Sequence, residues 1–188
     1  MQRFPRLSSV GLALVATVLV CVMTPPRAGA ATAEEIDRDA MVALGTLYDS
    51  APAAQTLAHT AVGVLVFPHV VKAGFVIGGQ YGEGVLTRQG TPAAYYNTAG
   101  ASYGLQAGVQ SYGYALFFMN AEALGYLDQS DGWEIGVGPS VVVVDEGMAK
   151  SLTTTTVQHD IYAFIFDQKG LMAGLGIQGN KITVIDQR

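Results

Sequence analysis

Three histidines lie beyond the first 30 residues, and their spacing predicts neither a metal centre nor a catalytic one. His59, His69 and His159 have no second histidine or cysteine at the separation that metal sites use. His159 and Asp160 are neighbours on an expected strand, where successive side chains point to opposite faces. The run Gly138–Val142 (GPSVV) lacks the final glycine of a G-x-S-x-G nucleophile elbow. We therefore expect no metal, no cofactor and no enzymatic activity.

The carboxylates and glycines also fit structural roles. The acidic pairs Asp128 with Asp131 and Asp145 with Glu146 fall in expected turns, and they supply too few oxygen ligands for a calcium loop. The segment Gly78–Gly82 (GGQYG) contains no G-x-x-x-x-G-K-[ST], and no helical pattern follows it. We interpret the glycines as positions where backbone is closely approached.

One stretch organises the expected fold, Gly74–Leu86 (GFVIGGQYGEGVL). Its odd positions begin Phe75, Ile77, Gly79 and Tyr81, whereas most even positions are glycine, a period of two that predicts a strand. The pattern recurs at Gly104–Gln110, Gly132–Gly138 and Gly170–Gly176. We expect four strands with large side chains inward and glycine where another layer comes close.

The first 30 residues have the pattern of an export signal. A basic start with Arg3 and Arg6 precedes an apolar run, Val10–Met23, and Ala28-Gly29-Ala30 is a small-residue cleavage site. We expect a signal peptide over 1–30 with cleavage after about Ala30, and a periplasmic, envelope or secreted protein over 31–188. Lipoprotein anchoring at Cys21 is the alternative, although the bulky Val20 before it fits that processing poorly.

Charge argues against nucleic acid as a partner. The whole chain has a formal net charge of −5, and residues 31–188 carry 7 basic and 15 acidic residues, a net charge of −8. There is no basic block to neutralise phosphates.

Residues 31–60 are expected to be helical. Thr32 and Glu35 have the spacing of a capping box, and Asp49–Pro52 divides the segment. An apolar stripe follows at helical spacing: Ile36, Ala40, Leu44, Leu47 and Tyr48. The stripe either packs on a sheet or contacts a membrane, although five acids against the single base Arg38 are unusual for a membrane-surface helix.

Residues 61–188 are expected to be β-rich, with short strands separated by turns. We expect a turn at Gln89–Pro92, hairpins through Thr98–Gly100 and at Asn180, and a strand at Ser151–Val157. The predicted fold class is α+β, mostly β, with N-terminal helices packed on an antiparallel β-sandwich or a closed β-barrel-like domain.

The candidate ligand-binding residues are basic or aromatic. Lys72 and Arg88 flank the glycine strand and are placed to meet an anionic headgroup. Six of the nine tyrosines lie between Tyr81 and Tyr114, and Tyr95 and Tyr96 are adjacent within them. They indicate either ordinary strand propensity or an aromatic rim at a lipid interface. Leu44 and Leu47 complete the candidate lipid-binding set.

Three long runs resemble the SYLF domain family, also described as a lipid-binding or actin-binding domain. They are GVLVFPHVVKAGFVIGGQYGEGVL (Gly63–Leu86), YGLQAGVQSYGYALFFM (Tyr103–Met119) and DGWEIGVGPSVVVVD (Asp131–Asp145). The resemblance covers roughly residues 35–187. It implies a non-enzymatic module. Eukaryotic members bind phosphoinositides, partly through a basic amphipathic N-terminal segment, and some bind actin, whereas members with export signals look like bacterial envelope proteins. Lys72 matches the lysine before the glycine strand, and the acidic helix at 33–48 occupies the place of the basic segment.

The expected function is an envelope module that binds lipid or another amphiphile, including anionic or phosphoinositide-like headgroups. Actin is not an expected partner of an exported chain. The alternative is a structural or homo-oligomeric envelope protein that packs its glycine-rich sheet faces against a partner. An outer-membrane barrel would fit the alternating strands, but not the doubly apolar runs Val141–Val144 and Ile161–Phe166.

Overall fold

The computed structural model describes residues 31–144, 152, 158–170 and 177–185, without the side chains of residues 76 and 102–107. Residues 31–188 form one compact unit. The expected signal peptide over 1–30, the turn at 145–147 and the strand at 151–157 lie outside the described residues, apart from residue 152.

The N-terminal segment forms two helices, α2 (Ala33–Ser50) and α3 (Pro52–Ala58). The predicted capping box is confirmed: Thr32 Oγ1 accepts from the Glu35 amide at 3.3 Å, and the Thr32 amide donates to Glu35 Oε2 at 2.9 Å. These bonds satisfy two amides that an α-helix leaves unpaired at its start. The bonds that the Thr32 amide and hydroxyl donate to the Glu35 carboxylate hold its pKa below the ordinary value. The stripe buries Ile36, Ala40 and Leu47.

Two long strands, β1 (Gly63–Arg88) and β2 (Thr91–Phe118), form a single antiparallel hairpin. The predicted turn is confirmed between them: Gln89 (φ 52°) and Gly90 (φ 77°) form a two-residue loop with positive φ at both positions, as right-twisted strands prefer. The predicted hairpin through residues 98–100 is wrong, because β2 runs through them without a break.

The remaining strands pair with different halves of β2. Strand β5 (Ile161–Gly170) pairs with residues 110–118, and β6 (Lys181–Ile185) pairs with residues 95–99. Two short strands, β3 (Trp133–Glu134) and β4 (Val141–Val143), lie at the two ends of the order β3-β6-β2-β5-β4, with β1 also on β2. The β4–β5 pair is parallel, and the other described pairs are antiparallel. The described strand pairs do not include β5 with β6, so they show no hairpin of these two strands at Asn180.

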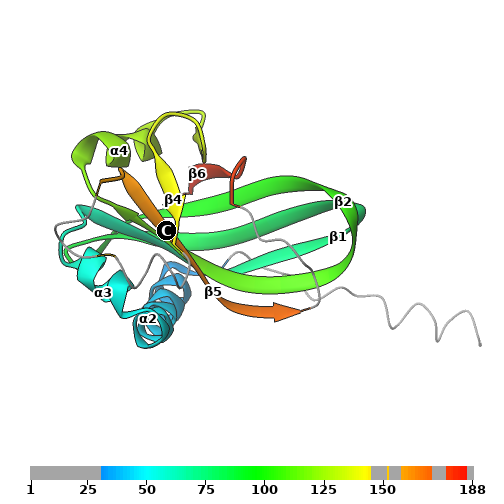
Figure 1. Ribbon diagram of the computed structural model, residues 1–188, viewed down its shortest axis with the longest axis horizontal. Coiled ribbons are helices and arrows are strands. Elements are labelled where there is room, and N and C mark those ends of the chain that lie inside the picture. Colours follow the sequence, from blue (N-terminus) through cyan, green and yellow to red (C-terminus); the bar gives the residue numbers. More distant parts are fainter. Residues whose placement is uncertain (1–30, 145–151, 153–157, 171–176, 186–188) are drawn as a thin grey trace, which may run out of the picture. The chain divides into compact units, whose positions relative to one another are not determined.

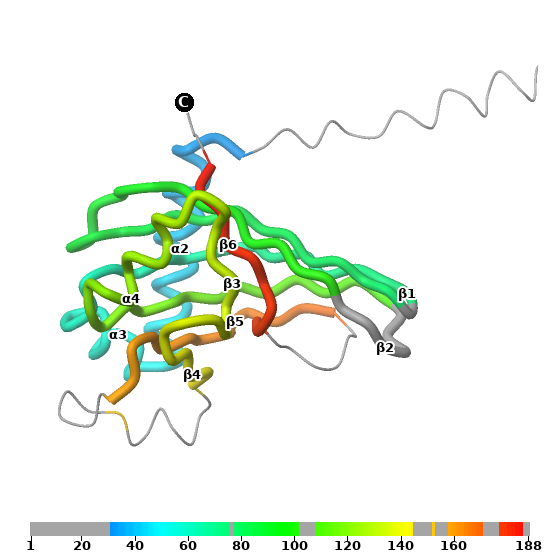
Figure 2. Tube along the Cα trace, turned by 90° about the horizontal axis from the view of Figure 1, so that it is seen from above, coloured from blue at the N-terminus to red at the C-terminus, as the bar shows by residue number. Residues whose placement is uncertain are grey.

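The β1–β2 hairpin extends away from the helices and bends back, so that its two halves face each other (Figures 1 and 2). The glycines make this possible. A Cβ at Gly82 would lie 2.8 Å from the His69 carbonyl oxygen and 2.8 Å from Val70 Cγ2, and one at Gly84 would collide with the Val66 carbonyl and the Phe67 ring. The predicted close approach to the glycine face is therefore confirmed, but the approaching layer is the same strand.

The prediction of a strand over the third glycine segment, Gly132–Gly138, is wrong. After the short helices α4 (Ala121–Gly125) and η1 (Tyr126–Asp128), only Trp133 and Glu134 of the run Gly132–Gly138 are strand. Gly132, Gly136 and Gly138 have φ values of +79°, +105° and +89°, so the segment is a turn. Most of the fourth segment, Gly170–Gly176, lies outside the described residues.

The core has two parts, one on each face of the sheet. The outer face carries Val64, Val66, Val85 and Phe117 beneath α2 and α3, whereas the inner face encloses side chains that include Leu65, Phe67, Leu86, Leu116 and Trp133. The predicted class, mostly-β α+β with N-terminal helices packed on the sheet, is confirmed, and the sheet is one curled sheet that folds over its own hairpin.

Candidate functional site

The most unusual surface lies where the hairpin bends back, in the middle of its two strands, at residues 71–81 of β1 and 99–110 of β2; we call this part the hairpin end. We call its exposed large apolar residues the apolar strip; they are Val71, Phe75, Ile77, Tyr81 and Val109, and each residue is 48% to 77% exposed. The strip belongs to the outer face, which α2 and α3 cover only farther along the strands. A cluster of this kind, unlike a scattered surface leucine, marks a place where a soluble protein meets an apolar partner.

The opposite face of the same hairpin end is polar and buried. We call this group the inner polar cluster; it comprises Lys72, Gln80, Thr98, Gln110 and Asn180, which are all buried. Two tyrosines from the adjacent core join it: Tyr112 donates to Gln80 Oε1 at 2.8 Å, and Tyr114 donates to Thr98 Oγ1 at 2.6 Å. Gln80 also donates to Asn180 of the β6 side. Burial raises the pKa of Tyr112 to about 12 and raises that of Tyr114 further.

The hairpin end therefore has apolar side chains outside and polar ones inside. This is the reverse of the pattern by which soluble sheets fold. A chain normally places large apolar side chains in the core because each gains about 1.5–3 kcal/mol on burial. The reversal makes the apolar strip a candidate binding surface.

The sequence explains how the reversal arises. A bulge between Phe67 and Val70 gives β1 one residue more than β2 over this stretch, so the inward positions change from odd to even numbers. From Val70 onward the even positions, including Lys72 and Gln80, face inward, and Phe75 and Ile77 face outward. The prediction that the large side chains of this strand point inward is therefore wrong.

The strip also lies in an uncharged part of the chain. Between Lys72 and Glu83, and again from Gln89 to Ala121, the sequence contains no Asp, Glu, Lys or Arg. Edge and surface strands of soluble proteins usually carry such charges to prevent association. The hairpin end therefore exposes no charged side chain that would oppose transfer of the strip to an apolar phase.

The six predicted lipid-binding residues do not form one site. Lys72 is only 5% exposed and belongs to the inner polar cluster, whereas Arg88 is exposed at the turn of the hairpin. Leu47 and Tyr96 lie in the core, on different faces of the sheet.

The other two predicted residues are partly buried where α2 meets the sheet. Leu44 packs against the outer core, and Tyr95 beside it donates from its hydroxyl to Asp37 of α2 at 3.0 Å. The predicted aromatic pair, Tyr95 and Tyr96, is thus part of the packing.

Sequence reasoning missed Phe75, Ile77 and Val109 as functional candidates because it assigned bulky strand residues to the core. A usable signal was present: the charge-free run from Gln89 to Ala121, which is unusual for a surface hairpin.

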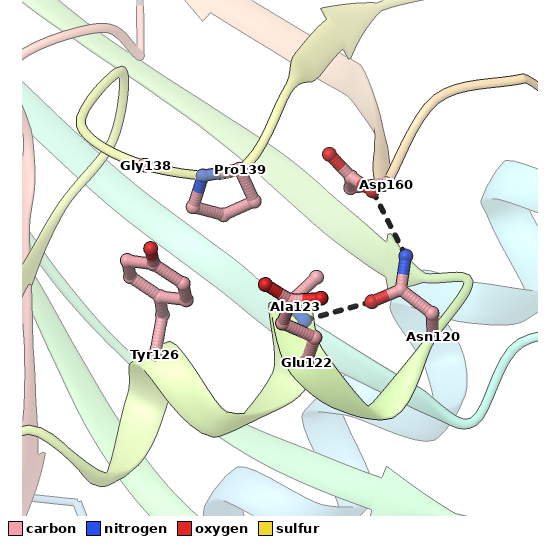
Figure 3. Close-up of a pocket in the computed structure, with 7 residues that line it drawn as sticks. All are labelled: Asn120, Glu122, Ala123, Tyr126, Gly138, Pro139 and Asp160. Carbon is pink, nitrogen blue, oxygen red and sulfur yellow. Dashed lines mark hydrogen bonds between the residues drawn. The ribbon is translucent and has the colours of Figure 1, made fainter.

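One small pocket lies between α4 and the turn before β4 (Figure 3). Its volume is about 180 Å³, and it is lined by Asn120, Glu122, Ala123, Tyr126, Gly138, Pro139 and Asp160. Two of its polar side chains, Asp160 and Asn120, have partners within the fold. Asp160 Oδ2 accepts from the Ser140 amide at 2.9 Å and from its hydroxyl at 2.8 Å, and Asp160 Oδ1 accepts from Asn120 Nδ2 at 2.9 Å. These bonds hold the pKa of Asp160 below its ordinary value, and Asn120 caps α4.

The described part of the chain has no group of three or more His, Cys, Asp or Glu side chains that could hold a metal ion. Within it, His69 Nε2 lies 3.8 Å from Asp39 Oδ2, a contact between β1 and α2. None of the described helices is both long enough and apolar enough to cross a bilayer.

The comparisons with known proteins point to one family. The family model Ysc84, described as Las17-binding protein actin regulator, matches residues 99–188, which include most of β2 together with β3 to β6. No curated protein matches the chain. The family match agrees with the resemblance carried by the runs at Tyr103–Met119 and Asp131–Asp145. Residues 99–188 are therefore similar to the Ysc84 (SYLF) domain family.

Proposed function

We propose that this protein is a non-enzymatic, exported envelope module that binds lipid membranes by placing the apolar strip in the apolar layer of the lipid. The observation that carries the proposal is the reversed hairpin end, with Phe75 77% exposed and Ile77 63% exposed above a buried polar cluster. A lipid phase accepts apolar side chains of any shape, so no preformed pocket is needed.

The strip is large enough for reversible binding. Complete burial of a large apolar side chain contributes about 1.5–3 kcal/mol, and the five strip residues still expose roughly half to three-quarters of their surface. Each strip residue that enters the lipid would then contribute about 1 kcal/mol or more, and about 5 kcal/mol requires all five to enter together. That is comparable to the marginal, reversible anchoring that one myristoyl chain provides. Tyr81, exposed at one end of the strip, suits the boundary between lipid and water.

Electrostatic attraction contributes little to this mode. Lys72 is buried, and Arg88 lies seven residues beyond Tyr81, about 23 Å along an extended strand. Residues 31–188 carry a net charge of −8. We therefore expect binding that depends only weakly on salt and on anionic lipid. In this proposal Lys72 does not bind a headgroup, in contrast to the role expected from the sequence.

Two further parts of the proposal concern location and chemistry. The export signal over 1–30 and cleavage after about Ala30 would place the protein outside the cytosol. The family description names Las17 binding and actin regulation; an exported chain would not meet cytosolic actin, so we propose membrane lipid as the partner. In the pocket beside Asp160, the side chains of Asp160 and Asn120 are bonded within the fold, which favours a structural role for them over a catalytic one.

A second candidate is a structural role in which another protein or a second copy covers the apolar strip. The same exposed side chains support it. It differs from the expected packing of glycine-rich faces, because Gly82 and Gly84 already pack against β1 itself and are not available to a partner.

The test is co-sedimentation with vesicles of phosphatidylcholine alone and of phosphatidylcholine with phosphatidylglycerol, at low and high salt. We compare the wild-type protein with the double variant Phe75→Ser/Ile77→Ser. The control is Val42→Ser, which replaces an apolar residue of α2 that is 67% exposed. The sequence offers this helix as an alternative site of membrane contact.

We expect the wild type and Val42→Ser to bind both vesicles, and the double variant to bind at least tenfold more weakly. Equal binding by the wild type and the double variant, or no binding at any composition, contradicts the proposal. A salt-independent oligomer without vesicle binding, detected by light scattering and lost in the double variant, favours the second candidate.

A further inference from the structure

The first described residue is held by a carboxylate from the middle of β1. The backbone nitrogen of Ala31 donates to Glu83 Oε2 at 3.1 Å, across 52 positions of sequence. The other oxygen of the same carboxylate, Glu83 Oε1, accepts from the Tyr81 hydroxyl at 2.8 Å. Both oxygens of Glu83 are thus used, one toward the start of the helical segment and one toward the apolar strip.

The position of Ala31 is fixed by the next residue. Thr32 is the N-cap of α2: its amide donates to Glu35 Oε2, and its hydroxyl oxygen accepts from the Glu35 amide. Ala31 itself is partly buried and packs against the outer core. Its nitrogen therefore cannot move far from Glu83 without loss of the cap.

Ala31 is also the residue that export would expose. The expected signal sequence ends in Ala28-Gly29-Ala30, so cleavage falls at the Ala30–Ala31 bond. In that hydrolysis a water oxygen bonds to the Ala30 carbonyl carbon and the C–N bond breaks. Ala30 leaves as a carboxylate, and the Ala31 nitrogen, protonated at neutral pH, becomes an ammonium group.

We propose that Glu83 is the receptor for the new amino terminus: cleavage after Ala30 turns the Ala31–Glu83 hydrogen bond into an ion pair that fastens the start of α2 to β1. The inference rests on the export proposed above, but not on lipid binding. An ammonium keeps N–H donors for Glu83 and adds a positive charge, which makes the bond charge-assisted.

The helix makes this counter-charge necessary. The amino end of an α-helix is the positive end of its dipole, so an ammonium there is unfavourable unless carboxylates offset it. The acidic side chains of the first turn are Glu34 and Glu35, and Glu35 is already bonded to Thr32. On β1, the groups facing the Ala31 nitrogen are the Glu83 carboxylate, which binds it, and the Tyr81 hydroxyl, which donates to that carboxylate. Farther along α2, Asp37 is bonded to Tyr95.

The consequence would be a fold that is completed only after export. Glu83 lies on the outer face of β1, between the apolar strip, which ends at Tyr81, and Val85 beneath α2. Cleavage would therefore tighten the boundary between the helix-covered part of the sheet and the strip.

The test uses the processed protein purified after export, with N-terminal sequencing to identify its first residue. Thermal unfolding is compared for the free amine and for the N-acetylated protein, which keeps an N–H donor but loses the charge. Both forms are measured in the wild type, in Glu83→Gln and in Glu34→Gln, an exposed glutamate of the same first turn.

Acetylation is expected to lower Tm by about 1–4 °C in the wild type and in Glu34→Gln, and to have no effect in Glu83→Gln. An equal effect of acetylation in the wild type and Glu83→Gln would overturn the proposal, as would a mature protein that begins at another residue. If Glu83→Gln does not fold, titration of the Ala31 amine by ¹⁵N NMR in the wild type decides. A pKa above the ordinary value of about 7.7–8.0 supports the ion pair, and an ordinary or lower value overturns it.

Discussion

One close approach in the fold that a mutation can probe is that of Gly82 to the facing half of its own strand. We predict that Gly82→Ala destabilises the protein, whereas Gly79→Ala on the same strand does not. The added methyl group at Gly82 would lie 2.8 Å from the His69 carbonyl oxygen, 2.8 Å from Val70 Cγ2 and 3.1 Å from Val70 Cα. At Gly79, on the opposite face, the nearest atom is the Gly100 carbonyl oxygen at 3.9 Å, an ordinary contact.

The magnitude follows from these distances. Overpacking of a closed site costs about 1–3 kcal/mol. Any Gly→Ala change gains about 0.4–1 kcal/mol by restricting the unfolded chain when the native φ is compatible. Neither glycine has a positive φ, so backbone strain does not confuse the comparison. We expect Gly82→Ala to lose about 1–2 kcal/mol net, and Gly79→Ala to be neutral or slightly more stable.

The assay is urea and thermal unfolding of both variants beside the wild type. For a domain of this size, 1 kcal/mol corresponds to about 2–4 °C in Tm, so Gly82→Ala should melt about 2–8 °C lower. If the two variants unfold alike, the hairpin does not fold back as described, and the argument for the reversed hairpin end fails with it.

Two further predictions concern titratable groups. The pKa of Asp160 is lowered mainly by bonds from Ser140, so its stabilisation is present above the unfolded pKa of about 3.9 and is lost as pH falls below it; Asp160→Asn should unfold at lower urea concentration at pH 7 and show a flatter acid dependence. Burial raises the pKa of Tyr112 to about 12 from 10.0, so the folded state loses stability as pH rises from about 10 to 12. In Tyr112→Phe that alkaline loss should shrink, and the bond to Gln80 should cost about 1 kcal/mol at neutral pH. Circular dichroism measures the pH dependence of unfolding in both variants. A pH dependence equal to that of the wild type in either variant would contradict the assigned contacts.

The local features of the fold could be predicted from the sequence because each depends on nearby residues. Thr32 and Glu35 specify the start of α2, and Gln89-Gly90 specifies the hairpin turn. The period of two in Gly74–Leu86 specifies a strand, and the exposure of alternate residues from Val71 to Gly82 confirms it.

The direction in which that strand faces could not be predicted. The bulge after Phe67 reverses which positions point inward, and the folding back of β1 is a contact between distant residues. A similar limit applies to Gly132–Gly138, because glycine at positive φ in a turn leaves the same pattern of letters as glycine on a strand face.

The candidate site was mislocated for a related reason. Bulky apolar residues are usually buried, so the sequence predicts Phe75 and Ile77 in the core, and it predicts the basic and aromatic residues Lys72, Tyr95 and Tyr96 at the surface. In the structure Phe75 and Ile77 are exposed and Lys72 and Tyr96 are buried. Only the three-dimensional arrangement distinguishes a core strand from a strand whose apolar side is left for a partner.

The central claim is that the outer face of the hairpin end enters lipid, and a tryptophan placed there tests it most directly. The only natural tryptophan, Trp133, is buried in the core and 1% exposed, so it gives a constant background. In Phe75→Trp we predict that vesicles shift the emission to shorter wavelength and that lipids brominated on the acyl chains quench it. Emission that stays at long wavelength and unquenched while the protein sediments with the vesicles would mean that another surface binds them, and would contradict the account.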